Sequence, residues 1–174
     1  MRRSRYVSLL VMGSASLLLT ACDDPVETAA FENVKQCIDS KMYSEAECRE
    51  SFTQAKEMHG TVAPTYASLK ECEADFGAAH CETGPQATSS GHSTFIPMFM
   101  GYMIGRSLGS AIVPAQPLYR NYQGGTPGSF RTASNVEVAR APGAAKVYPA
   151  DVKRPGRVTT LSRGGFGSRS FAGG

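Results

Sequence analysis

The sequence predicts a small, mainly α-helical protein: a disulfide-stapled head, then one apolar helix with regularly spaced glycines, then a largely disordered C-terminal tail. Two similar cysteine-bearing segments with helix-capping signals lie between residues 31 and 82. An apolar run with a glycine at every fourth position follows at 95–114. Residues 115–174 are rich in Gly, Ser, Thr, Pro and Arg without a sustained hydrophobic period, which is typical of disorder.

Residues 1–21 have the layout of a secretory signal peptide. Three arginines precede an apolar run at 7–19 that is too short to cross a bilayer. The ending "LTAC" at 19–22 resembles the lipobox of bacterial lipoproteins, which implies cleavage before Cys22 and acylation, with palmitate as one of the chains, at that cysteine. Two such lipid signals anchor a chain stably, and residues 22–30 would then be a tether. The alternative is an ordinary cleaved signal with a chance cysteine.

The positions after Cys22 predict a location. In enterobacterial lipoproteins, acidic residues directly after the lipidated cysteine tend to retain the protein at the inner membrane, and here those residues are Asp23 and Asp24. We therefore expect a lipid-anchored protein of the cell envelope that faces the periplasm, with the inner membrane favoured.

Acidic and basic residues are unevenly distributed along the mature chain. Residues 22–94 contain thirteen acidic and five basic residues, a net charge of −8, and residues 115–174 contain nine basic and two acidic residues, a net charge of +7. Such halves can attract each other. Alternatively, the basic tail can bind an anionic envelope component such as a lipid headgroup, lipopolysaccharide or the cell wall, or it can simply stay solvated.

The head contains a tandem repeat, at 31–48 and 66–81. "FENVKQC" aligns with "YASLKEC", and "YSEAEC" aligns with "FGAAHC". Each unit holds two cysteines, and four cysteines permit three disulfide pairings. Duplication of a self-contained unit favours Cys37 with Cys48 and Cys72 with Cys81, each worth about 3 kcal/mol in the chain-entropy model.

Local signals predict the helices of the head. Capping-box spacing occurs three times, at Asn33 and Gln36, Ser44 and Glu47, and Ser68 and Glu71. We expect a short and then a longer helix in the first unit, with Gly60 able to end the longer one, and a short helix that stops near Gly77 in the second unit.

No motif in the chain predicts catalysis, a cofactor or a metal. The spacings C-x10-C and C-x8-C lack the short clips of structural zinc sites, and H-E-x-x-H and P-loop motifs are absent from the sequence. We therefore expect a protein that is not an enzyme. A copper(I) site built from Met98, Met100 and Met103 is an alternative to methionine as a packing residue.

The apolar segment 95–114 follows a linker, 83–94. A helix over 98–113 would be about 24 Å long, shorter than a hydrocarbon core of about 30 Å, and Arg106 lies near its middle. The composition therefore disfavours a membrane span.

Gly101, Gly105 and Gly109 would share one side of such a helix, as in a glycine zipper. This pattern predicts docking to an envelope protein, to a second copy or at the membrane surface, where Arg106 would reach lipid headgroups. The alternative is a core helix that covers the head. The final "SRGGFGSRSFAGG" is similar to RNA-binding segments, but an exported chain meets little RNA, so we expect no nucleic-acid partner.

The order of these parts resembles the YgiB family of uncharacterised bacterial proteins, sometimes grouped under a biofilm-formation label. The similarity rests on "PTYASLKECEADFGAAHC", "PMFMGYMIGRSLG", "QPLY" and "SRGGFG". The resemblance implies an envelope protein of unknown activity and supplies no catalytic residue. The leading hypothesis is thus a non-enzymatic envelope lipoprotein that docks through the glycine-spaced helix, and the alternative is a module that binds an anionic component through its basic tail.

Overall fold

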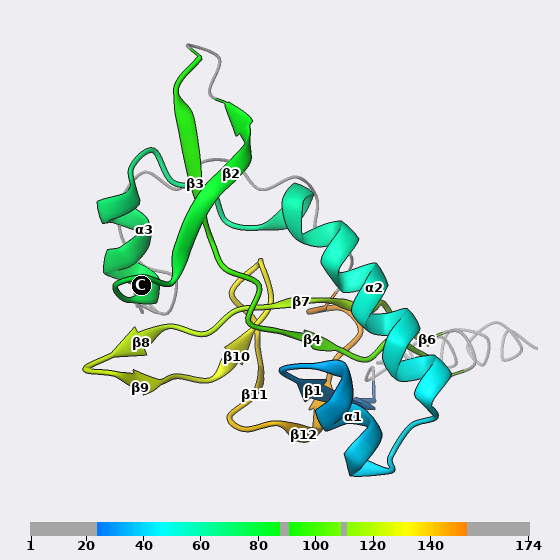
Figure 1. Cartoon of the computed structure of the whole chain (residues 1–174). Coiled ribbons are helices and arrows are strands. Elements are labelled where there is room, and N and C mark those ends of the chain that lie inside the picture. The colour runs from blue at the N-terminus through cyan, green and yellow to red at the C-terminus, as the bar shows by residue number, and fades with distance from the viewer. Residues whose placement is uncertain (1–23, 88–90, 109–110, 153–174) are drawn as a thin grey trace, which may run out of the picture.

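The centre of the protein is a four-stranded antiparallel sheet (Figure 1). The computed structural model describes residues 24–87, 91–108 and 111–152. The strand order in the sheet is β12-β1-β4-β7, so the first strand of the described chain pairs with the last. The bounds are β1 (Val26–Phe31), β4 (Gly101–Met103), β7 (Gln116–Leu118) and β12 (Gly143–Val147).

Three helices, α1 (Val34–Ser40), α2 (Glu45–Val62) and α3 (Leu69–Phe76), form between Val34 and Phe76. Each begins at a predicted cap: the side chains of Asn33, Ser44 and Ser68 accept hydrogen bonds from backbone N–H groups in the first turn. Figure 1 shows α2 lying across β4 and β7, with α1 beside β1.

Four two-stranded ribbons surround the sheet. The longest pairs β2 with β3 and projects from one end of the molecule next to α3 (Figure 1). The ribbons are β2 (Cys81–Ala87) with β3 (Ser93–Pro97), β5 (Arg106–Leu108) with β6 (Ala111–Val113), β8 (Tyr122–Gln123) with β9 (Thr126–Pro127), and β10 (Phe130–Arg131) with β11 (Glu137–Ala139).

The sheet is buried on both faces because alternate residues of its strands enter different clusters. In β1, Ala29 and Phe31 pack with α1 and α2, whereas Val26 and Ala30 pack with the C-terminal strands. A third cluster joins the end of α2 to α3 and the β2–β3 ribbon around Tyr66, a fully buried residue.

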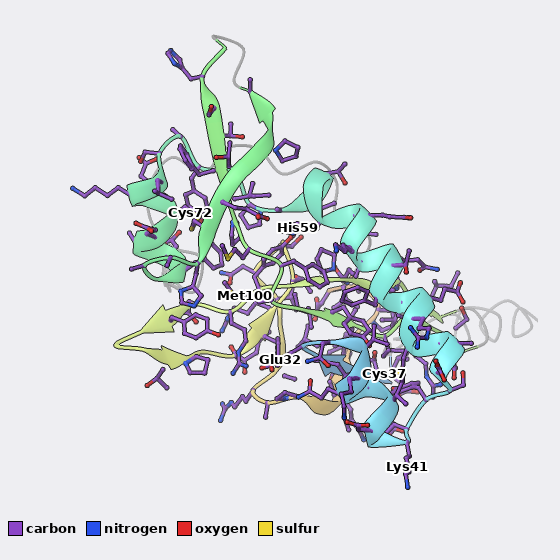
Figure 2. All side chains as sticks on the ribbon, in the orientation of Figure 1. Glu32, Cys37, Lys41, His59, Cys72 and Met100 are labelled. Carbon is purple, nitrogen blue, oxygen red and sulfur yellow. A yellow bond between two sulfur atoms is a disulfide. The ribbon has the colours of Figure 1, made fainter. Side chains whose placement is uncertain are left out.

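Two disulfides, Cys37–Cys48 and Cys72–Cys81, hold the helices in place, and these are the pairs that the repeat predicts. The first joins α1 to α2, and the second joins α3 to the start of β2 (Figure 2 labels Cys37 and Cys72). All four sulfur-bearing residues belong to the buried core.

The prediction of a mainly α-helical protein was wrong. The predicted helices of the head are present, but the described chain contains several antiparallel sheets around them. Residues 26–30 of the expected tether form most of the strand β1, and much of the expected linker 83–94 forms the β2–β3 ribbon.

The prediction of a glycine-spaced helix was also wrong, because the described residues 93–108 and 111–113 contain the strands β3 to β6. The reason is burial on both sides: β4 lies between β1 and β7, and Tyr102 and Met103 belong to clusters on opposite faces of the sheet. A strand covered on both faces is a continuous apolar run, which periodicity alone does not separate from a buried helix.

The expectation of a largely disordered tail was wrong for residues 115–152, which form β7 to β12. The strand β12 is paired with β1 over five residue pairs, from Val26 with Val147 to Ala30 with Gly143. Short strands separated by glycine and proline turns have no long hydrophobic period, so composition alone suggested disorder. Residues 153–174 lie outside the described part.

Candidate ligand-binding cavity

A cavity of about 500 Å³ opens beside the edge of the sheet where β1 and β12 pair. Its volume is within the range of small-molecule sites in proteins. The wall combines charged, hydroxyl and apolar side chains from both ends of the described chain, from the α1–α2 connection and from β5. The lining residues are Glu27, Thr28, Met42, Tyr43, Arg106, Ala144, Ala145 and Lys146.

Among the described residues Arg106 forms no ion pair, but it lies close enough to Glu47 to contribute, after the hydrogen bonds with Ser44, to the lowered pKa of that carboxyl. Its guanidinium carbon lies 5.3 Å from the centre of the Tyr43 ring, a cation–π contact. Its Nε atom is buried and has no hydrogen-bond partner among the described residues. A buried donor without a partner costs about 1–3 kcal/mol, so the fold holds Arg106 at the cavity wall at some cost in stability.

Tyr43 provides the neutral donor of the cavity. Burial is the main cause that raises the pKa of its phenol above the ordinary value of 10.0, with Glu47 and Glu27 adding to the rise and Arg106 opposing it. The hydroxyl group therefore remains protonated at neutral pH and can donate a hydrogen bond.

Lys146 and Glu27 form an ion pair on the adjacent strands β12 and β1 at the same cavity. Their side-chain atoms are 3.5 Å apart, and both side chains are largely exposed. Such a surface pair contributes little to stability and can rearrange around a ligand. Thr28 differs, because its hydroxyl already donates to the backbone oxygen of Ile104 at 2.7 Å.

Arg106 also lines a neighbouring cavity of about 300 Å³, between α2 and the β5–β6 ribbon. The α2 side of this cavity carries Glu47 and Glu50, and its other side includes Ile112, which is 66% exposed. Arg106 therefore forms part of the wall of two adjoining hollows, one partly apolar and one more acidic.

A second polar cluster lies at the end of α2 and has an enzyme-like composition. His59 Nδ1 is 3.1 Å from the hydroxyl oxygen of Tyr119, and His59 Nε2 is 3.2 Å from a carboxylate oxygen of Glu82 (Figure 2 labels His59). Burial lowers the pKa of His59 below 6.5, and hydrogen bonding to Glu82 partly opposes this. Tyr119 is fully buried, so this cluster joins α2 to β2 and to the end of β7.

The structure separates the glycines that were predicted to share a helix face. Gly101 lies in β4, and Gly105 lies between β4 and β5. A Cβ atom at Gly105 would be 2.9 Å from the backbone nitrogen of Ala115, so this glycine also permits a close approach, but within this chain. Gly109 and the predicted lipidation site Cys22 lie outside the described residues.

The three methionines of the copper alternative lie in different environments. Met103 is fully buried in the core, Met98 is 41% exposed, and the sulfur of Met100 accepts a hydrogen bond from the backbone N–H of Arg120 (Figure 2 labels Met100). Within the described ranges, no three His, Cys, Asp or Glu side chains are grouped as metal ligands.

None of the three helices in the described ranges combines the length and the apolar character that a membrane span requires.

Sequence analysis identified Arg106 but not the residues around it. Tyr43 was visible only as an aromatic position of the repeat, and Met42 and Lys146 carried no signal of a site. They meet because β12 pairs with β1, a contact between residues about 120 positions apart that no local pattern indicates.

These features define a small, disulfide-stabilised α+β protein with a cavity that contains an unpaired cation. The chain belongs to the family described as "Protein of unknown function (DUF1190)", whose model matches residues 25–173. The resemblance to the uncharacterised YgiB-type family is thereby confirmed at the family level. The family carries no named activity, and no solved structure matches the chain.

Curated relatives cover most of this chain. A UPF0441 protein of Klebsiella pneumoniae subsp. pneumoniae is 32% identical over 88% of this chain and 76% of its own length. A UPF0441 protein of Erwinia tasmaniensis is 33% identical over the same shares of the two chains. A UPF0441 protein of Photorhabdus laumondii is 29% identical over 95% of this chain and 82% of its own length. These names assign no activity, so the function must be argued from the site.

Proposed function

We propose that this protein is a non-enzymatic, lipid-anchored binding protein of the bacterial cell envelope, and that its folded part binds an anionic envelope component at the Arg106 cavity. The observation that carries the proposal is the Arg106 guanidinium, which lies on a cavity wall against an aromatic ring without a carboxylate partner in the described part of the chain. Arginine forms paired hydrogen bonds with carboxylates and phosphates, so an unpaired arginine in a hollow is suited to an anionic ligand.

Two buried disulfides support the envelope location. Disulfides persist in oxidising compartments such as the periplasm and are rare in the bacterial cytosol. The signal-like residues 1–21 and the lipobox-like ending at Cys22 agree with export and anchoring. Asp23 and Asp24 favour retention at the inner membrane under the enterobacterial rule.

The packing of His59 supports a binding role over a catalytic one. Both ring nitrogens have protein partners, Tyr119 and Glu82, and the ring itself is buried between α2 and Phe99. A general base must reach a substrate proton directly or through one water molecule. A histidine that links three segments of the core is better explained as a structural residue.

The described part of the basic tail is less suited than the Arg106 cavity to binding an anionic component. Arg120, Arg131 and Lys146 form ion pairs with Glu32, Glu137 and Glu27 respectively, so their charges are already compensated. Two of these pairs, Arg120 with Glu32 and Lys146 with Glu27, join the basic C-terminal half to the acidic head, whereas Glu137 belongs to the C-terminal half itself.

The envelope component is tested by co-sedimentation of the purified protein with three separate materials: purified cell-wall sacculi, lipopolysaccharide aggregates and anionic phospholipid vesicles. We expect one of these materials to retain the unmodified protein. The same material should not retain the Arg106→Gln variant. Arg140→Gln is the matched control, because Arg140 is 92% exposed and its loss changes the net charge equally. Equal retention of both variants, or retention by none of the materials, would contradict the binding role.

Anchoring is tested separately in cells. Labelled palmitate should be incorporated into the protein and should disappear in Cys22→Ala. Membrane fractionation then gives the location, and recovery of the labelled protein in the outer-membrane fraction would contradict the preference for the inner membrane.

A further inference from the structure

We infer that the anionic group bound at the Arg106 cavity is a carboxylate that carries a short apolar substituent. This inference rests on the proposed function and adds the chemical class of the ligand. It is drawn from the charges around the cavity, from its hydrogen-bond donors and from its apolar wall.

The charges favour a monoanion. Glu27 lines the cavity, and Glu47 is close enough to influence the Tyr43 phenol together with Glu27. Lys146 is paired with Glu27, whereas Arg106 forms no ion pair in the described cavity and interacts with Glu47 only at longer range. A phosphate dianion would bring a second negative charge toward these two carboxylates, whereas a carboxylate brings one.

The donors fit the geometry of a carboxylate. A guanidinium presents its N–H groups in a plane, and a carboxylate can accept two of them in parallel. Tyr43 lines the same cavity, and its ring centre lies 5.3 Å from the Arg106 guanidinium carbon. Its hydroxyl group keeps its proton at neutral pH and can donate to a ligand that reaches it.

The remaining wall favours an apolar substituent. Met42 is 46% exposed although it lines the cavity, and Ala144 and Ala145 add methyl groups from β12. Each methylene group that leaves water for such a wall is worth about 0.8 kcal/mol when fully buried. A cavity of about 500 Å³ accommodates a short chain but also limits its length.

The test is a set of titrations of the purified protein, followed by the chemical shifts of the backbone amides of Ala144, Ala145 and Lys146. The probes are acetate, pentanoate, pentanamide, inorganic phosphate and acetyl-alanyl-alanine with a free carboxylate. We expect pentanoate to bind roughly two- to fourfold more tightly than acetate for each added methylene that is buried. Pentanamide should not bind measurably, because it lacks the charge, and phosphate should bind more weakly than pentanoate.

Three variants assign the effect to the cavity. Arg106→Gln should weaken pentanoate binding at least tenfold, Tyr43→Phe should weaken it about threefold to tenfold, and Arg140→Gln should leave it unchanged. Thermal unfolding of each variant shows whether it is folded, and Tyr43→Phe keeps the ring packing in place. If Arg106→Gln does not fold, the affinity of Tyr43→Phe for pentanoate still tests whether the ligand binds in this cavity.

The outcomes separate this inference from the proposed function. Tight phosphate binding, or carboxylate binding without dependence on chain length, would overturn the inference while anion binding at Arg106 stands. The absence of any anion binding would overturn both. Stronger binding of the dipeptide than of pentanoate would support the inference and would indicate that the carboxylate belongs to a peptide C-terminus. Stronger binding of pentanoate would support the inference and would indicate a free carboxylic acid.

Discussion

The backbone oxygen of Phe31 in β1 lies 2.7 Å from the position that a Cβ atom would occupy at Gly101 in β4. The two central strands therefore approach each other closely because residue 101 has no side chain. A carbon of the Phe130 ring lies 3.0 Å from the same position, so the space is closed on a second side.

Gly101→Ala should destabilise the protein. The added methyl group would displace the backbone of β1 or the Phe130 ring, and such overpacking typically costs about 1–3 kcal/mol. The free energy of unfolding from urea denaturation measures the effect. Gly60→Ala is the control: its methyl group would meet Pro85 at an ordinary 3.5 Å, and alanine in a helix is favoured by about 1 kcal/mol, so this variant should be more stable.

Removal of either disulfide should lower stability to a similar degree. The disulfides close short loops, with sequence separations of 11 and 9 residues, and the chain-entropy model gives about 3 kcal/mol for loops of this size. We compare the double variants Cys37→Ala/Cys48→Ala and Cys72→Ala/Cys81→Ala by urea denaturation. An unchanged unfolding midpoint in either double variant would show that the removed disulfide does not contribute to the stability of the protein.

Glu32→Gln should cost more than the loss of an exposed ion pair. Arg120 is largely buried: it donates to Glu32 at 2.9 Å and to the backbone oxygen of Gly128 at 2.8 Å, and it lies 4.4 Å from the centre of the Phe130 ring. Without the carboxylate, the buried charge keeps one strong acceptor, and we expect a loss of about 1–3 kcal/mol.

The matched control for that pair is Asp39→Asn, which removes the exposed pair of Lys35 and Asp39 on α1. This change should alter the free energy of unfolding by less than about 0.5 kcal/mol. Equal effects of the two variants would contradict the structural role of Arg120.

Stability should fall as the pH is lowered through the ordinary histidine pKa of 6.5. Burial is the main cause that lowers the pKa of His59 in the folded state, so on acidification the unfolded chain gains its proton first. The His59 contribution is therefore complete above about pH 6.5 and is lost toward the lower pKa of the folded state. His59→Gln should flatten the profile of unfolding free energy between pH 7.5 and 5.5, measured by urea denaturation, and an unchanged slope would contradict this account.

Sequence reasoning succeeded where the signals were local. The caps at Asn33, Ser44 and Ser68 depend on residues three positions apart, and each disulfide joins cysteines of one repeat unit, 11 or 9 positions apart. These features depend on short-range geometry that a repeat or a capping box encodes directly.

The rest depended on contacts between distant residues. Residues 101–104 are apolar because β4 is covered on both faces, and the glycines at 101 and 105 accommodate neighbouring backbone of the same chain. A single sequence cannot distinguish this arrangement from a buried helix, since both produce an unbroken apolar run. The cavity was missed for the same reason, because Tyr43, Arg106 and Lys146 meet only through the sheet.

The central claim of this account is that the Arg106 guanidinium binds an anionic group. The most direct measurement is the ¹H–¹⁵N signal of the Arg106 Nε–H group during a titration with pentanoate, assigned by its loss in Arg106→Gln. We predict that this signal shifts progressively and saturates, because a carboxylate bound at the guanidinium changes the electrostatic environment of the Nε–H group. An Arg106 signal that stays unchanged at saturating pentanoate would contradict the claim.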